Sequence, residues 1–475
     1  MKCNENNNEI DDFEEINNEI YFDDDDENNN NNKIINKIDE IKNKIIFNIF
    51  NFQNKFDFNQ INNNYKNIQI FNEKNEIESK LKNLIYFSYR ININFKYENK
   101  FFNSDSGWGC MIRCYQMILC KALMKILKIE EKKIFYQKYL ILFLDLVLNK
   151  KFIIENKFFG FEKYLKLNEK KKNFFPFFSL PFLSNFDKKK IFFPGKFFSN
   201  YVLNEILYEI FNDFQPFENI NFFSFDSIVY LNDLIKNNFS IAKCNCIENE
   251  YEIIENEEFF IDFEKDEKII FVDKKINKKK YCKCLKKTIK IELINKEKKK
   301  KFFNKNYYKF NKKFILFINF REGYEKIEKS TIKKILKFFD FNSNVGFLSG
   351  NKNRAFYFVG KFDKNEEKNF IFLDPHFVQE NINLNDVLNL NFKSFETEKF
   401  YFINAENISP SFTLGFSFEN IDDFIDFIEK SNCLKIKENS DEKKFYLNFN
   451  FDNFINFKYD KNLNNENIIK LTLIK

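Results

Sequence analysis

The chain has 475 residues, which leaves room for two or three domains, or for one large domain with extensions, and excludes a single small module. Its 76 Lys and Arg nearly balance its 70 Asp and Glu, so the net charge is only +6. A dedicated nucleic-acid-binding protein would carry a larger and more clustered positive excess, and we expect no nucleic-acid partner.

Rare residue types carry most of the information in this sequence. Phenylalanine occurs 69 times, whereas glycine occurs 9 times and tryptophan and histidine occur once each. The nine cysteines are scattered and odd in number, which indicates reduced thiols. Residues 1–26 are acidic and rich in Asn, unlike a secretory signal, and the most apolar stretch, 174–186, is too short to span a bilayer. We therefore expect a cytoplasmic protein.

Five segments are expected along the chain. Residues 1–78 are of low complexity and predict a mostly disordered N-terminal extension. Residues 79–245 and 314–440 have globular patterns and would form the two parts of one catalytic domain. The lysine-rich insertion at 246–313 carries charge runs typical of a solvated segment. Residues 441–475 are expected to be a C-terminal tail.

Hydrophobic spacing predicts helices early in the globular parts and strands later. Helical spacing is found in Tyr139–Leu148 and Tyr201–Phe211. Later patterns predict a strand at Phe314–Phe320, a helix around 329–339, strands near Phe347, at Ala355–Val359 and at Phe370–Leu373, and a helix at about 421–431. This mixed order favours an α+β or α/β layered domain over an all-helical one.

The segment from Asn103 to Met124 has the features of a reactive cysteine at a helix start. Ser104, Asp105 or Ser106 can cap a helix, which places Cys110 at or near its N-terminus. There the helix dipole and the free N–H groups lower the pKa of a thiol and make the sulfur nucleophilic. Gly107 and Gly109 flank Trp108 and would let a substrate backbone approach, whereas Cys114 and Cys120 lie within the helix body and are expected to be packing residues.

A thiolate that cleaves a peptide bond needs an acid for the leaving amine, and His376 is the one imidazole in the chain. Asp374 precedes it by two residues on an extended segment that Pro375 stiffens, so the two side chains share a face and the carboxylate can orient the ring. Together with Cys110, these residues predict the catalytic triad of a cysteine hydrolase.

These residues carry a resemblance to a known family. The run SDSGWGCMIRCYQMILCKAL at 104–123 resembles the nucleophile motif of the autophagins, the autophagy-related cysteine proteases, and LDPHFVQ at 373–379 resembles their Asp-Pro-His motif. Further similar segments are FSYR at 87–90, FINFREG at 317–323, VGFLSGNKNRAFYFVG at 345–360 and SPSFTLGF at 409–416. The resemblance covers about residues 81–431, apart from the insertion.

The resemblance implies a papain-like α+β cysteine protease fold with a small auxiliary subdomain and low-complexity insertions. It implies cleavage after the C-terminal glycine of a ubiquitin-like autophagy modifier, both to mature the precursor and to release the modifier from phosphatidylethanolamine. The enzyme would need no cofactor or metal and would touch autophagic membranes only transiently, through its lipid-conjugated substrate.

The same resemblance implies a role for each site residue. Cys110 would be the nucleophile, His376 the general acid and base, and Asp374 its orienter. Tyr89 matches a tyrosine near the oxyanion hole, where the Cys110 N–H would be the other donor. The narrow substrate slot would be formed by Gly107, Trp108 and Gly109.

Three positions depart from the family pattern. Where the family has a tryptophan in a loop over the nucleophile, the loop at 194–203 offers only Phe197, Phe198 or Tyr201. Phe356 stands where the family has a second histidine, and Ser349 replaces a glycine. The identity of the gating aromatic and the loop shape are therefore open.

Three alternatives remain beside this interpretation. The protease family of the ubiquitin-fold modifier also shows Gly-Trp-Gly-Cys and Asp-Pro-His, although its pattern after the cysteine differs. A pseudoprotease could bind the modifier without cutting it, which the intact triad argues against. Four cysteines in two C-x-C pairs could bind zinc, but this spacing is less typical than C-x-x-C: Cys244, Cys246, Cys282 and Cys284.

Overall fold

The computed structural model describes residues 65–71, 81–156, 160–168, 173–186, 192–229, 231–241, 262–264, 268–270, 288–291, 306–323, 326–351, 353–364, 366–397, 399–433 and 448–449. Most of the predicted N-terminal extension, of the lysine-rich insertion and of the C-terminal tail lies outside the described residues. The four cysteines of the two C-x-C pairs lie outside them as well.

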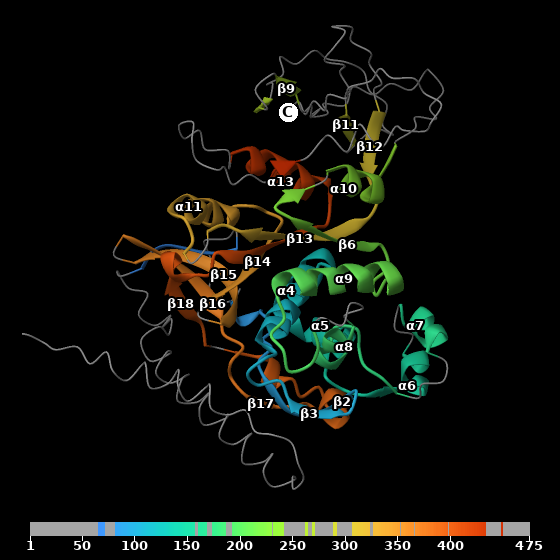
Figure 1. The fold of residues 1–475 in the computed structure, drawn as a ribbon. Helices are drawn as coiled ribbons and strands as arrows, with labels where there is room; N and C mark the ends of the chain where they lie inside the picture. Colours follow the sequence, from blue (N-terminus) through green and yellow to red (C-terminus); the bar gives the residue numbers. More distant parts are fainter. Residues whose placement is uncertain are drawn as a thin grey trace, which may run out of the picture.

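An eight-stranded sheet forms the centre of the molecule (Figure 1). Its strands follow the order β18-β16-β15-β14-β19-β13-β6, and β1 pairs with β15. All neighbours are antiparallel except β6 and β13, which are parallel. The strands are β1 (Tyr65–Ile70), β6 (Ile220–Asp226), β13 (Lys313–Arg321), β14 (Asn344–Asn351), β15 (Arg354–Lys364), β16 (Glu367–Leu373), β18 (Tyr401–Asn404) and β19 (Ser411–Phe418).

Helices cover both faces of this sheet. One face packs against α4 (Cys110–Ile126) and α9 (Asn200–Phe214), and the other packs against α11 (Lys329–Phe338) and α13 (Ile421–Cys433). Alternate side chains of β13 point to opposite faces, so Phe317 joins the α4 side and Leu316 the α11 side. Burial on both faces explains the continuous apolar run at Phe314–Ile318 of this strand.

A smaller layer on the α4 side surrounds the beginning of that helix. It contains a three-stranded sheet in the order β17-β2-β3 and several short helices. Its elements are β2 (Arg90–Tyr97), β3 (Lys100–Ser104), α5 (Lys132–Lys138), η2 (Leu140–Phe143), β4 (Leu148–Asn149), α6 (Lys150–Glu155), α7 (Phe161–Leu167), β5 (Asn173–Phe174), α8 (Leu180–Asn185), β17 (Gln379–Glu380), α12 (Leu384–Leu388) and η4 (Lys393–Phe395).

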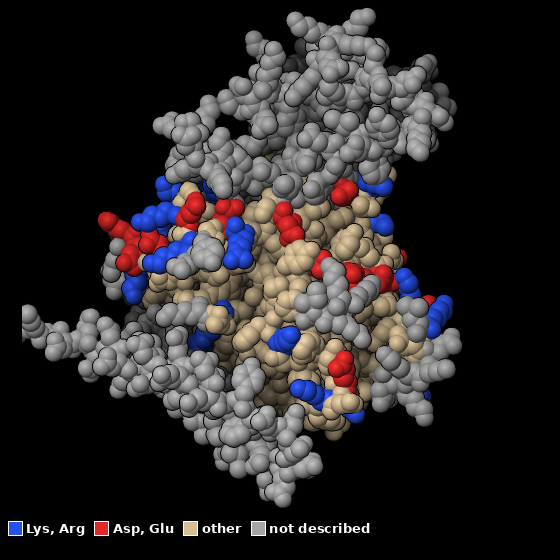
Figure 2. Space-filling model, in the orientation of Figure 1, with Lys and Arg blue, Asp and Glu red and all other residues tan. Residues whose placement is uncertain are grey.

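The remaining described elements lie mostly around the insertion. Strand β8 pairs with β12, so the chain leaves and re-enters the domain through adjacent antiparallel strands. These elements are β7 (Ile228–Val229), α10 (Leu231–Asn238), β8 (Phe239–Ile241), β9 (Asp262–Glu264), β10 (Lys268–Ile270), β11 (Thr288–Ile291), β12 (Asn306–Phe310), η5 (Ala405–Asn407) and β20 (Asn448–Phe449). On the face drawn in Figure 2, described Lys and Arg are interspersed with Asp and Glu, as the near balance of charge suggests.

The predicted α+β class is confirmed, as are the strands β13 to β16 and the helices α9, α11 and α13. The helix expected at 139–148 is wrong: only the short η2 forms there, and the chain is then extended into β4. Backbone groups of this segment bind elsewhere, since Phe178 N–H donates to the Leu142 carbonyl and Gln116 Nε2 donates to the Phe143 carbonyl. Among the described residues, no helix is long and apolar enough to cross a membrane.

Candidate active site

Cys110 is the first residue of α4, as the sequence predicts, but the helix begins differently from the expectation. Gly109 occupies the N-cap position and no side chain caps the helix, so the expected capping by Ser104, Asp105 or Ser106 is wrong. Instead, the Asp105 carbonyl accepts hydrogen bonds from Trp108 N (3.2 Å) and Gly109 N (2.8 Å). The tight turn that precedes Cys110 is therefore held by backbone groups.

The two glycines beside Cys110 have different roles. Gly107 has a positive φ of +86°, and a Cβ added there would meet nothing within 4 Å, which fits the open approach predicted for a substrate. A Cβ on Gly109 would lie 2.3 Å from Asp105 Oδ2. Gly109 is therefore required by a buried carboxylate, a reason that the sequence did not reveal.

His376 follows the end of β16, and Asp374 holds its ring. Asp374 Oδ1 lies 2.5 Å from His376 Nδ1 and also accepts from the His376 backbone N–H at 3.0 Å. Both residues are buried, with side chains 0% and 9% exposed. The carboxylate thereby fixes the ring with Nε2 directed away from Asp374, as expected for an orienting residue.

In the structure Cys110 lies beside His376, and each of the two groups shifts the pKa of the other. Burial disfavours the Cys110 thiolate, but hydrogen bonds and the His376 charge outweigh it, so the pKa of Cys110 is lowered. Burial also disfavours the imidazolium, but Asp374 and Cys110 raise the pKa of His376 to about 9. For Asp374, burial is outweighed by His376, and its pKa is lowered. The arrangement therefore favours a thiolate–imidazolium pair.

Two further groups lower the pKa of Cys110. One is the hydroxyl of Tyr89, whose ring stands edge-on to the His376 ring with centroids 5.3 Å apart. Burial, and then the neighbouring thiolate, raise the pKa of Tyr89 well above its usual value, so the hydroxyl stays protonated. The other is the backbone of Ala355 on β15, which also lowers the pKa of Cys110. A backbone donor from β15 leaves no signal in a side-chain pattern, and the sequence analysis missed it.

Two of the departures from the family pattern, Phe356 and Ser349, have clear neighbours in the structure. The Phe356 ring lies edge-on to His376, with centroids 5.7 Å apart, so an apolar wall covers the imidazole. Ser349 is buried, and its hydroxyl donates to the carbonyls of Ser409 and Ser411. A serine is accommodated there because it finds two acceptors on a neighbouring segment.

The loop at 194–203 is linked through Phe102 to Trp108, in the turn that precedes Cys110. A Cβ on Gly195 would lie 3.2 Å from the Phe102 ring, which stands edge-on to Trp108. Phe198 is 3% exposed, whereas Phe197 is 55% and Tyr201 is 47% exposed. Which of them narrows the slot stays a prediction.

The other described cysteines behave as packing residues. Cys114 and Cys120 are fully buried in α4, and burial raises the pKa of both thiols well above the usual value. This explains why one of three cysteines on the same helix is the candidate nucleophile. Among the residues that the structure describes, no group of three or more His, Cys, Asp or Glu could hold a metal ion.

Residues 74–430 match the family defined by the peptidase C54 catalytic domain, which is more than half of the chain. The chain belongs to the peptidase C54 family. The predicted autophagin resemblance is confirmed, because curated members similar to this chain are named as the cysteine protease ATG4.

The similarity to individual members of the peptidase C54 family is local. The chain is 31% identical over 127 residues to "Cysteine protease ATG4a" of Arabidopsis thaliana and 30% identical over 129 residues to "Cysteine protease atg4" of Dictyostelium discoideum. A third relative, "Cysteine protease ATG4" of Candida albicans, is 27% identical over 128 residues. Each match covers 26% of this chain, and they span 26%, 16% and 26% of the three relatives.

Proposed function

We propose that this protein is a cysteine protease that cleaves after the C-terminal glycine of a ubiquitin-like autophagy modifier. The observation that carries the proposal is the continuous chain of contacts from Asp374 through His376 to Cys110 at the start of α4. Membership of the peptidase C54 family supports the same activity and favours it over that of the ubiquitin-fold modifier protease.

The proposed reaction follows from these contacts. The Cys110 thiolate attacks the scissile carbonyl, and the oxyanion that forms accepts from the Tyr89 hydroxyl and from the Cys110 N–H, which has no intrahelical acceptor in the first turn of α4. His376 gives its proton to the leaving amine as the C–N bond breaks. Water, deprotonated by His376, then cleaves the thioester and restores the thiolate. Asp374 holds the imidazole throughout.

One mechanism serves both proposed substrates. In the precursor the leaving group is a peptide amine, and in the lipid conjugate it is the ethanolamine amine of phosphatidylethanolamine. Both leave from the same glycine carbonyl and require the same proton from His376. We propose that the protein acts on both in the cytosol and meets autophagic membranes only through the conjugate.

Glycine at the cleavage position follows from the shape of the turn before Cys110. The substrate carbonyl has to pass beside Gly107 and Trp108, and Trp108 is only 6% exposed. A side chain on the substrate residue would displace the carbonyl from the oxyanion donors. Replacing this glycine by alanine should therefore cost more than the roughly 1–3 kcal/mol of one misplaced methyl group.

Competition among modifier precursors tests the proposed function. Purified protein is incubated with precursors of the autophagy modifier, the ubiquitin-fold modifier and ubiquitin, each with its native C-terminus, and with an alanine variant of the first. We expect cleavage of the first precursor alone. Preference for the ubiquitin-fold modifier would assign the rival activity, and binding without turnover would identify a pseudoprotease.

We further propose that residues 79–245 and 314–440 form one catalytic unit. The contact between Cys110 of the first part and His376 of the second supports this division. The parallel pairing of β6 with β13 joins the same two parts in the central sheet.

A further inference from the structure

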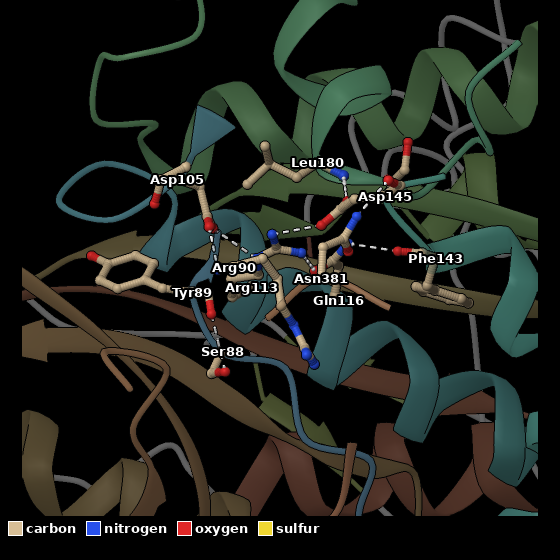
Figure 3. A network of polar contacts seen from close by, with 12 residues as sticks. Ser88, Tyr89, Arg90, Asp105, Arg113, Gln116, Phe143, Asp145, Leu180 and Asn381 are labelled. Carbon is tan, nitrogen blue, oxygen red and sulfur yellow. Dashed lines mark hydrogen bonds and ion pairs between the residues drawn. The ribbon is translucent and has the colours of Figure 1, made fainter. Parts of the chain in front are cut away.

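Four charged side chains are buried together in one polar network (Figure 3). Arg90, Asp105, Arg113 and Asp145 are 1%, 0%, 1% and 5% exposed. Removing such charges from water costs several kcal/mol for each ion, and apolar residues of similar volume often replace buried ion pairs with no loss of stability. Stability is therefore a weak explanation for this cluster, and its contacts suggest another one.

Asp105 connects the turn before the nucleophile to two other elements. Its carbonyl accepts from Gly109 N at 2.8 Å. Its Oδ1 accepts from the backbone N–H of Arg90 at 2.6 Å, and its Oδ2 accepts from Arg113 Nε at 2.8 Å. One residue thus ties the backbone next to Cys110 to β2 and to the next turn of α4.

The contact with β2 leads directly to the catalytic histidine. Tyr89 precedes Arg90, and its backbone N–H donates to the Pro375 carbonyl at 2.9 Å. The Tyr89 carbonyl accepts from Gln379 N at 2.9 Å. Pro375 and Gln379, which flank His376 in the sequence, are therefore both hydrogen-bonded to Tyr89, the residue before the one that Asp105 binds.

A second set of contacts joins α4 to the segment after His376, and it passes through Arg113. Its Nη2 lies 2.6 Å from Asp145 Oδ2, and its Nη1 donates to Gln116 Oε1 at 3.0 Å. The Asp145 carbonyl accepts from Asn381 Nδ2 at 3.0 Å, and Asp145 Oδ1 accepts from Leu180 N at 2.7 Å. Arg113 therefore also joins the nucleophile helix to the chain that follows the histidine.

We infer that Asp105 and Arg113 are positioning residues that hold Cys110 Sγ next to the His376 imidazole before any substrate binds. This inference rests on the proposed roles of Cys110 and His376. The two residues do not touch the reacting atoms. Loss of either would let the nucleophile helix and the histidine segment shift independently, and a displacement of about 1 Å can cost roughly 100-fold in rate.

Two conservative variants test the inference. Asp105→Asn keeps the volume but loses the charge and one of the two accepted bonds. Arg113→Lys keeps the charge but cannot bind both carboxylates, because lysine lacks the planar fork of arginine. The control, Asn344→Ala, removes a buried side chain at the start of β14 that donates to the carbonyls of Phe339 and Phe341 in the turn after α11, outside the charged cluster.

Two readouts are measured at temperatures where circular dichroism shows each variant to be folded. The first is the pH dependence of iodoacetamide alkylation at Cys110, followed by mass spectrometry of that peptide. The second is kcat and KM with the autophagy modifier precursor. We expect both test variants to raise the alkylation midpoint and to lower kcat about 100-fold with KM nearly unchanged. The control should lower Tm and leave both readouts unchanged.

The outcomes separate this inference from the proposed function. If both variants have the same alkylation midpoint and the same kcat as the wild type, the positioning inference is overturned and the cluster has a purely structural role. If Asp105→Asn does not fold, Arg113→Lys decides alone. If the wild type cleaves no precursor but the variants still raise the alkylation midpoint, the proposed substrate is wrong and the positioning inference stands.

Discussion

The two faces of the central sheet are packed with different chemistry. On the α4 side, the core contains the buried charges that surround Asp105. On the α11 side, the buried side chains are mostly aliphatic and aromatic, and Lys334 of α11 is a single buried charge among the described residues beside them. The Phe416 ring, for example, has its centroid 5.1 Å from that of Phe338 and 4.9 Å from that of Phe427. Apolar packing suffices to hold helices on a sheet. The difference suggests that a network of buried charges is retained where the side chains of a site must be positioned. Where helices only have to stay on the sheet, apolar packing is enough.

The largest expected effect lies at the site itself. Cys110→Ala and His376→Gln should each lower turnover roughly 10⁴-fold or more, because the chain has no other imidazole and no other cysteine of α4 has a lowered pKa. Precursor cleavage measures the loss, and circular dichroism serves as the folding control. Near-normal turnover by His376→Gln would show that the triad is wrongly assigned.

A substitution in the aromatic cluster on the α11 side should instead lower stability and leave turnover unchanged. Phe416→Ala removes a fully buried ring and should lower the free energy of unfolding by about 3–5 kcal/mol. Below its Tm the variant should keep the wild-type kcat, and Phe416→Leu should lose less stability. Denaturant unfolding and turnover are measured on the same samples. A large fall in kcat in the folded variant would break the contrast between the faces.

The thiolate–imidazolium pair predicts a pH dependence. With the pKa of His376 raised to about 9, kcat/KM should fall about tenfold per pH unit above that value as the leaving-group proton is lost. The pKa of His376 in the folded protein, about 9, is higher than its ordinary value of 6.5 in an unfolded chain. His376 therefore stabilises the folded state fully below pH 6.5, and this contribution is lost as the pH rises through about 9. The pH–rate profile checks the first statement. A fall centred near pH 6.5 would contradict it.

A smaller effect is expected at Ser349. Ser349→Ala removes a hydroxyl that donates to two carbonyls and should cost about 1 kcal/mol of stability. Turnover should be unchanged, since Ser349 touches none of the triad in the contacts described above. Thermal unfolding and precursor cleavage are compared with the wild type. A tenfold loss of kcat would place this position in the catalytic machinery.

The smallest effect is expected from the insertion. Ile241 pairs with Tyr308 and Phe239 pairs with Phe310, so the two ends of the insertion are adjacent. Removing residues 249–304 and joining the ends by a short linker should leave cleavage almost unchanged, because loop-closure entropy varies slowly with length. Loss of folding, or zinc bound stoichiometrically to the full-length chain, would show that this segment is more than a solvated insertion.

Several elements could be predicted because one local signal dominates. Strand β13 holds an uninterrupted apolar run at Phe314–Ile318, and α9 repeats apolar residues at helical spacing. The segment at 139–148 has the same apolar richness but forms only a short turn, since its backbone groups are bound by Gln116 and Phe178 from other parts of the chain. Partners that are distant in sequence cannot be read from spacing.

The sequence by itself predicted the chemistry that we propose for this protein. A single histidine after Asp-Pro and a cysteine between rare glycines and a helix pattern leave few other choices, since a scarce residue type has few positions from which to act. Only the tertiary structure decided how these groups are held: the carboxylate of Asp105 that requires Gly109, the Ala355 backbone that lowers the pKa of Cys110 and the two sets of contacts with the histidine segment. These contacts join backbone atoms and buried charges far apart along the chain, and their distances are set by how the whole domain packs.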